Sequence, residues 1–193
     1  MFGRFKRKPQ PAVVTVSLNA RLAPADRAAL EDAFGDLCRH REIDAEVVGG
    51  GTLLAESGEV KACDIEIQLA DASQTQLDFV REAFTAMLAP IGSRLHAPDR
   101  DAPIVFGAHQ GLALYLNGTD LPQAVYDTCD IHHVVEECER LLGERGMVNS
   151  HWQGPSETAL YMYGADFEQM HAAIRPFLDA YPLCRECRVE RIA

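Results

Sequence analysis

The sequence predicts an α+β fold, a tandem duplication of the ferredoxin-like unit (βαββαβ ×2), with antiparallel sheets and helices on one face of each. Apolar periodicity gives the order strand, helix, strand, strand, helix, strand in each half of the 193-residue chain. Asn19 recurs 98 positions later as Asn117, and Asp71 recurs 95 positions later as Asp166. Near-constant offsets between matching elements are typical of an internal repeat.

The first copy is predicted to span residues 12–97, after a basic, disordered tail over residues 1–11. Its predicted strands cover 12–18, 43–48, 64–69 and 91–95. Pro24 suits the first turn of the first helix, and Ser73 with Gln76 has the spacing of a capping box before the second helix. The run 49–51 consists of three glycines and is interpreted as a flexible bend, because no Walker or G-x-G-x-x-G spacing accompanies it.

The second copy is predicted to span residues 111–193, and residues 98–110 are predicted to be a linker. Its strands should lie near 112–116, 147–152, 158–163 and 188–192. Its helices should begin at Asp130 and Asp166, each a good N-cap residue. With so short a linker, the copies could pack sheet to sheet or align their edges into one sheet.

Charge is distributed unevenly along the chain, whose formal net charge is -11. Residues up to Ala97 include 11 basic and 14 acidic side chains, whereas the remainder includes 7 and 15. Such a surface repels phosphate backbones, so nucleic acid is not an expected partner, and a basic protein is. No apolar run is long enough to span a bilayer and no secretory signal is evident, so we expect a cytoplasmic protein without membrane contact.

Strand alternation distinguishes the two copies by the face that points away from the helices. In the first copy this face is polar, with Thr15 and Glu66 among its side chains. In the second copy it should carry Tyr115, Tyr161 and Tyr163, with Asn117 at the strand end and Trp152 nearby. The predicted binding residues are these second-copy side chains and one residue of the first copy: Tyr115, Asn117, Trp152, Tyr161, Tyr163 and Asn19.

Three interpretations of the tyrosine face are open. The rings could pack against the other copy or a partner subunit, because aromatic side chains supply buried contact area. They could bind a protein or small ligand. Their positions also resemble the stacking platform of an RNA-recognition module, although its basic-aromatic signature is absent and the local charge is negative.

Cysteines and histidines offer no recognisable catalytic or metal motif, and no cofactor is expected. Cys184 and Cys187 have C-x-x-C spacing but no second ligand pair follows in the sequence, so we interpret them as ordinary reduced thiols. His132 and His133 are adjacent in a predicted first helical turn, where they cannot both face one ion. Both should be solvated.

The leading hypothesis is a non-enzymatic binding or regulatory protein. Its acidic, tyrosine-bearing second copy would engage a basic protein partner, as an inhibitor of a basic toxin might. The alternative is a small-molecule-binding enzyme or sensor, with a ligand in the groove between the copies, near Asn19, Asn117 and the glycine run. A homo-oligomer that buries the tyrosines is a third possibility.

Overall fold

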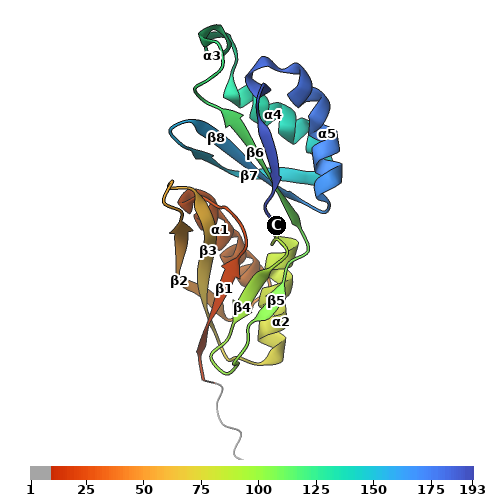
Figure 1. Cartoon of the computed structure of the whole chain (residues 1–193). Coiled ribbons are helices and arrows are strands. Elements are labelled where there is room, and N and C mark those ends of the chain that lie inside the picture. The colour runs from red at the N-terminus through yellow and green to blue at the C-terminus, as the bar shows by residue number, and fades with distance from the viewer. Residues whose placement is uncertain (1–9) are drawn as a thin grey trace, which may run out of the picture.

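The computed structural model describes residues 10–193 and confirms an α+β fold with two ferredoxin-like copies (Figure 1). The first nine residues of the predicted tail lie outside the described residues. Copy 1 contains β1 (Ala12–Leu18), α1 (Pro24–His40), β2 (Ala45–Leu54), β3 (Val60–Leu69), α2 (Gln74–Ala86), β4 (Ser93–His96) and β5 (Ile104–Phe106). Copy 2 contains β6 (Gln110–Asn117), α3 (Gln123–Thr128), α4 (Ile131–Leu142), the 3-10 turn η1 (Gly143–Arg145), β7 (Gly146–Gln153), β8 (Glu157–Gly164), α5 (Phe167–Ala180), the 3-10 turn η2 (Pro182–Cys184) and β9 (Arg188–Arg191).

The two sheets have matching topologies. Strand order is β2-β3-β1-β4-β5 in copy 1 and β7-β8-β6-β9 in copy 2, and the first and third strands of each unit are central neighbours. All strand pairs within the sheets are antiparallel. The predicted order of elements and the placement of the helices on one face of each sheet are therefore confirmed.

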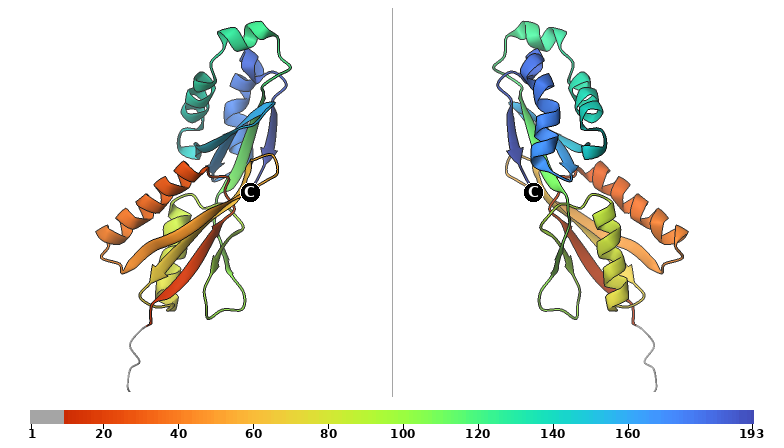
Figure 2. Two further views of the ribbon diagram at one scale, coloured as in Figure 1. Left: turned by 90° about the vertical axis from the view of Figure 1, so that its left-hand side faces the viewer. Right: turned by 90° about the vertical axis from the view of Figure 1, so that its right-hand side faces the viewer.

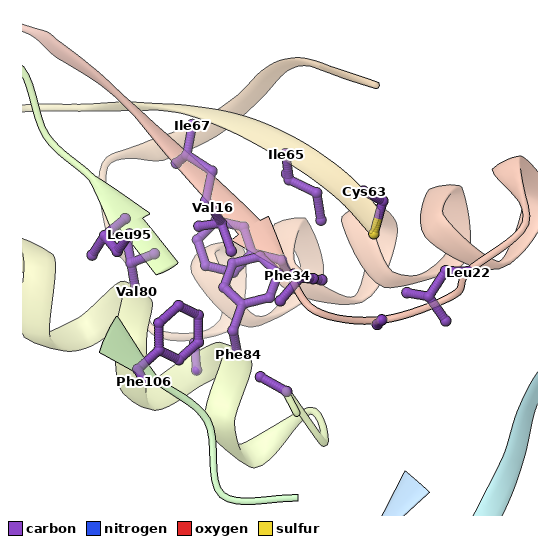
Figure 3. Close-up of a cluster of buried hydrophobic side chains, with 14 of the residues drawn as sticks. Val16, Leu22, Phe34, Cys63, Ile65, Ile67, Val80, Phe84, Leu95 and Phe106 are labelled. Atoms are coloured by element: carbon purple, nitrogen blue, oxygen red, sulfur yellow. The ribbon is translucent and has the colours of Figure 1, made fainter. Parts of the chain in front are cut away.

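Each copy has its own core between sheet and helices, as strand alternation requires. In copy 1, Val16 and Ile65 of the sheet meet Phe34 of α1 and Phe84 of α2, whose rings stack with centroids 5.0 Å apart (Figure 3). In copy 2, the core is formed by leucine and methionine side chains of β6 and β8 together with inward residues of α4 and α5.

The glycine run lies inside β2, so its interpretation as a bend is wrong. Gly49 and Gly50 pair with Glu66 and Ile65 of β3, next to a bulge that follows Val47. A Cβ atom at Gly50 would lie 2.5 Å from the Asp64 carbonyl oxygen. These glycines therefore permit close approach of two strands, which is the other common use of glycine in a sheet.

The predicted linker is partly structured. Within it, β5 pairs antiparallel with β4 and buries Phe106 against the copy 1 core. Gly107, with φ of +96°, then turns the chain toward β6. The fourth strand begins at Ser93 rather than residue 91, and α3 was not expected.

Helix starts follow the sequence in most cases. Pro24 begins α1, and the side chains of Asp130 and Asp166 accept hydrogen bonds from the backbone nitrogens of His132 and Gln169. The capping box at Ser73 is wrong, because the Ser73 side chain makes no cap hydrogen bond. Asp71 instead accepts from the Ser73 nitrogen at 2.9 Å.

The copies pack neither sheet to sheet nor edge to edge. The helix-free face of the copy 2 sheet lies against the end of copy 1 where β1 leads into α1 and where β2 turns into β3 (Figure 2). Side chains of β6 and β8 consequently belong to the same buried cluster as the copy 1 core: Ala113, Tyr115, Ala159, Tyr161 and Tyr163.

Candidate functional site

The three tyrosines lie on the predicted face of the copy 2 sheet, but copy 1 covers them. Tyr115, Tyr161 and Tyr163 are 3%, 0% and 1% exposed. An open tyrosine surface for a partner is therefore incompatible with this structure, and the interpretation that the rings pack against the other copy describes what is seen. The region of interest is the interface between the copies.

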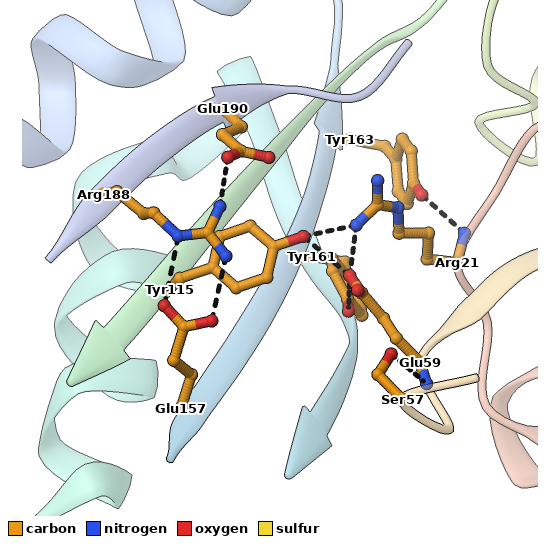
Figure 4. A network of polar contacts seen from close by, with 9 residues as sticks. All are labelled: Arg21, Ser57, Glu59, Tyr115, Glu157, Tyr161, Tyr163, Arg188 and Glu190. Carbon is orange, nitrogen blue, oxygen red and sulfur yellow. Dashed lines mark hydrogen bonds and ion pairs between the residues drawn. The ribbon is translucent and has the colours of Figure 1, made fainter. Parts of the chain in front are cut away.

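Glu59 is the centre of a polar network in this interface (Figure 4). Its Oε1 atom accepts hydrogen bonds from the hydroxyls of Tyr115 at 2.6 Å and Tyr161 at 2.7 Å, and it pairs with Arg21. The Arg21 guanidinium also contacts the Tyr115 hydroxyl and lies 5.4 Å from the centroid of the Tyr161 ring. Copy 1 thus supplies the two charges, and copy 2 supplies the two phenols.

Local structure explains why Glu59 and Arg21 point at copy 2. Glu59 follows the turn between β2 and β3, in which Gly58 has a φ of +82°. The Ala55 nitrogen donates to the Glu59 carbonyl at 2.8 Å across this turn. Arg21 lies between the buried Ala20 and Leu22, so its own side chain is directed out of the copy 1 core.

The network keeps its charge distribution across the neutral range. Burial raises the pKa of Glu59, but the hydrogen bonds from Tyr115 and Tyr161 and the charge of Arg21 outweigh it, so the pKa lies below its ordinary value. Burial and the hydrogen bond to Glu59 raise the pKa of Tyr115 to about 12. The same two causes raise the pKa of Tyr161. One carboxylate therefore faces two neutral phenols and one guanidinium.

Copy 2 side chains also satisfy backbone amides of the loop between β1 and α1. The Arg21 nitrogen donates to the Tyr163 hydroxyl at 2.7 Å, and the Ala23 nitrogen donates to Ser150 Oγ at 3.0 Å. Ser150 Oγ in turn donates to Asp26 Oδ2 at 2.6 Å. These contacts fix the start of α1 against β7 and β8.

Arg188 of β9 covers the other side of Tyr115. Its guanidinium carbon lies 3.6 Å from the ring centroid, and it forms hydrogen bonds of 3.1 and 2.9 Å to the two carboxylate oxygens of Glu157. These bonds, more than the nearby charge of Glu190, raise the pKa of Arg188. Tyr115 is therefore held between two arginines, one from each copy.

An open-mouthed cavity of about 370 Å³ lies next to this network, where α1 and the end of α2 meet β7. Tyr163 joins the two features, because its ring lines the cavity while its hydroxyl binds the Arg21 nitrogen. The walls are chiefly apolar, with Leu18, Leu30 and Phe84 among them. Asp26 and Asn149 provide polar groups, and the buried Oδ1 of Asn149 has no hydrogen-bond partner among the described residues.

The other predicted site residues lie elsewhere. Asn117 Oδ1 accepts from the backbone nitrogens of Thr119 and Asp120 and so orders the turn after β6. Asn19 instead donates to the Ile91 carbonyl at 2.9 Å. Trp152 is half-buried and packs against the buried cluster that both copies share. Neither asparagine nor the glycine run lines the cavity between the copies, so that part of the alternative hypothesis was misplaced.

Sequence reasoning missed Arg21, Asp26, Glu59, Asn149 and Ser150. Each is an ordinary polar residue in a turn, a helix or a strand, and none belongs to a motif. The sequence gives only an indirect indication of them. An aromatic sheet face on copy 2 indicates that other residues must pack against it, but strand alternation does not identify those residues.

A second cavity, of about 770 Å³, lies at the equivalent end of copy 2, beside the start of α4. Three of its polar side chains already have protein partners. Asp130 caps α4, the Tyr126 hydroxyl bonds with the Leu121 nitrogen and the Asn117 carbonyl, and Glu157 holds Arg188. We regard the cavity between the copies as the better candidate, because both copies build it and because the buried Oδ1 of Asn149 in its lining has no partner among the described residues.

The cysteines and most histidines lie outside both interface features. All six thiols are free, and burial raises the pKa of Cys184 to about 12. His132 and His133 are exposed, as predicted, and His133 packs edge-on against Tyr181. Within residues 10–193 no group of three or more His, Cys, Asp or Glu side chains is arranged to hold a metal ion. No helix in this range is long and apolar enough to cross a membrane.

Comparison with known proteins gives neither a family nor a curated relative. No family model matches the chain, and no curated protein matches it. Among solved structures, a "putative monooxygenase" from Fusobacterium nucleatum is 11% identical, with 96% of this chain and 92% of that chain covered and a TM-score of 0.31.

Two further solved structures are similar at the same level. A "putative monooxygenase" from Lactobacillus acidophilus is 14% identical, with 95% and 94% coverage and a TM-score of 0.30. The first two RRM domains of yeast poly(U)-binding protein are 13% identical, with 94% and 99% coverage and a TM-score of 0.27. The ferredoxin-like assignment of each copy follows from its strand order.

Proposed function

We propose that this protein binds a small, largely apolar molecule in the cavity between its two copies. The observation that supports the proposal is the cavity itself, whose volume of about 370 Å³ lies in the range of ligand pockets. Its mixture of apolar walls and few polar groups is also typical of such sites. Both copies build it, so a bound molecule would contact α1 and α2 of one and β7 and β8 of the other.

The proposal requires that filling the cavity prevent binding. Ala29 lies on the exposed face of α1 and lines the cavity, whereas Ala28 is its exposed neighbour outside the lining. A thermal-shift screen of uncharged and charged fragments should find compounds that stabilise the protein; a ligand at 100 times its Kd adds about 2.7 kcal/mol. Ala29→Leu should remove this stabilisation and Ala28→Leu should retain it. Equal responses of the two variants would contradict the proposed site.

A basic protein partner is a second candidate, supported by the acidic charge of copy 2. Glu136, Glu139 and Glu144, on α4 and the turn after it, are exposed and form no ion pair within residues 10–193. The proposed surface for a basic partner does not include the tyrosines, because copy 1 buries them. Calorimetry with lysozyme as a basic probe should show binding at low salt that weakens as salt increases and is reduced by Glu136→Gln with Glu139→Gln. No binding at low salt would contradict it.

We also propose that the protein acts in the cytoplasm. A reducing compartment would keep the six free thiols reduced. Growth of cells that express a tagged chain, followed by fractionation, tests this directly: recovery in an exported fraction would contradict it.

A further inference from the structure

We infer that the cavity between the copies selects a neutral or cationic molecule that donates hydrogen bonds from a polar end, and that it rejects anions. This inference rests on the proposed function, since it names the class of ligand for the same cavity. Three features of the lining carry it: an acceptor-only carboxylate, an unpaired amide and the absence of a cationic side chain among the lining residues.

Asp26 is the reason that the cavity should favour ligand groups that donate a hydrogen bond. Its Oδ2 accepts the Ser150 hydroxyl at 2.6 Å, while Oδ1 accepts no hydrogen bond from any residue in 10–193. An ionised carboxylate accepts and cannot donate. A ligand group that approaches Oδ1 must therefore bring its own hydrogen, as an ammonium, an amide N–H, a ring N–H or a hydroxyl does.

Asn149 supplies the second contact. Its Oδ1 atom is buried and unpaired among the described residues, and a buried acceptor without a partner is unfavourable until a donor reaches it. An amide can rotate to present either its oxygen or its nitrogen, so Asn149 alone would not choose between donors and acceptors. The carboxylate of Asp26 is the group that favours donors over acceptors.

An anion would find no counterion in this cavity. The lining includes neither Lys, Arg nor His. The arginines that precede and follow this part of α1 are already committed: Arg21 pairs with Glu59, and Arg27 pairs with Glu31 at 2.9 Å and donates to Thr52 at 3.2 Å. A carboxylate or phosphate on the ligand would lie near Asp26 and be repelled by it.

The rest of the lining favours a flat or compact apolar body. Leu22 and Phe84, two buried side chains of the copy 1 core (Figure 3), are both in the lining. Met87 and Met147 are also in the lining, and methionine side chains adapt to irregular shapes. Indole derivatives therefore make suitable probes, because they keep one body and change only the charge of the attached group.

The test compares tryptamine, indole and indole-3-acetate by isothermal calorimetry on the full chain at neutral pH. We expect tryptamine to bind most tightly, indole less tightly and indole-3-acetate at least about tenfold more weakly than tryptamine, as one charge-assisted hydrogen bond gained or lost would give. Asp26→Asn can still accept from Ser150, and it should lower tryptamine affinity about tenfold with little effect on indole. Asp32→Asn, on the exposed side of α1, is the charge-matched control and should leave all three affinities unchanged.

The outcomes separate this inference from the proposed function. If indole-3-acetate binds as well as tryptamine and Ala29→Leu abolishes both, the cavity is a ligand site and the inferred class is wrong. If Asp26→Asn and Asp32→Asn lower the affinity for tryptamine equally, Asp26 does not accept a hydrogen bond from the ligand and the inference also fails. If none of the three probes binds and the fragment screen also finds no cavity-dependent ligand, the proposed function itself is overturned.

Discussion

Replacing Glu59 with alanine should destabilise the protein strongly, because three donors at the interface share this one carboxylate. The hydroxyls of Tyr115 and Tyr161 lie 2.6 and 2.7 Å from Oε1, and both rings are buried. A hydrogen bond to a charged acceptor contributes about 1.5 kcal/mol at the lower end of its range, so two give about 3 kcal/mol. The Arg21 pair is 25% and 20% exposed and adds up to about 1 kcal/mol.

The expected loss of unfolding free energy is therefore about 3–4 kcal/mol, measured by urea denaturation. Trp152, the single tryptophan, packs against the buried cluster that both copies share, and its Nε1 atom would lie 3.9 Å from a Cβ atom at Gly58 of copy 1, so its fluorescence reports on separation of the copies. Far-ultraviolet circular dichroism reports on the whole chain. Glu56→Ala is the matched control: Glu56 is exposed in the same turn, and its loss should change stability by no more than about 0.5 kcal/mol.

A double-mutant cycle with Tyr161→Phe tests the cause. Glu59→Ala and Tyr161→Phe should be non-additive by about 1 kcal/mol or more, because each removes the same hydrogen bond. The account of the network is refuted if Glu59→Ala costs no more than Glu56→Ala, or if the two substitutions are additive.

Three further predictions concern the same interface and the chain leading into it. Tyr163→Phe removes the acceptor of the Arg21 nitrogen, 2.7 Å away, and should cost about 1–3 kcal/mol in urea denaturation; a cost near zero would show that this amide finds another partner. The folded-state pKa of Tyr115, about 12, lies above its ordinary value of 10.0, so its contribution to stability is fully present below pH 10 and is lost as pH rises toward 12. Denaturation midpoints over this range should fall less steeply for Tyr115→Phe than for the natural chain, and equal slopes would argue against the assigned environment. Gly107→Ala should cost about 2 kcal/mol or more, because φ is +96° and the new Cβ would lie 1.9 Å from the Pro90 carbonyl oxygen, whereas Gly51→Ala meets nothing within 4 Å and should be nearly neutral.

Much of the fold was predictable because it depends on local periodicity. Alternation along β6 and β8 correctly placed Tyr115, Tyr161 and Tyr163 opposite the helices of copy 2. Alternation assigns a side chain to a face, but it does not say what covers that face. The covering residues, Arg21 and Glu59, come from two turns of the other copy, and their position depends on how the copies pack.

The incorrect predictions have the same cause, because each depended on contacts that local sequence patterns do not show. The glycines at 49–51 were compatible with a bend or with close strand pairing, and only the position of the Asp64 carbonyl decides between them. The Ser73 capping box failed because Asp71 accepts from the Ser73 nitrogen and orders the same turn in another way. The cavity was not located because its walls combine α1 and α2 of copy 1 with β7 of copy 2.

Site-resolved nitration of the five tyrosines tests most directly the claim that copy 1 buries the aromatic face of copy 2. The native protein would be treated with tetranitromethane and the modified positions identified by peptide mass spectrometry. The account predicts that Tyr126 and Tyr181, which are half-buried, react while Tyr115, Tyr161 and Tyr163 are protected, and that Glu59→Ala weakens this protection. Nitration of Tyr115 and Tyr161 in the native chain as fast as Tyr126 would show that the face is open and would contradict the account.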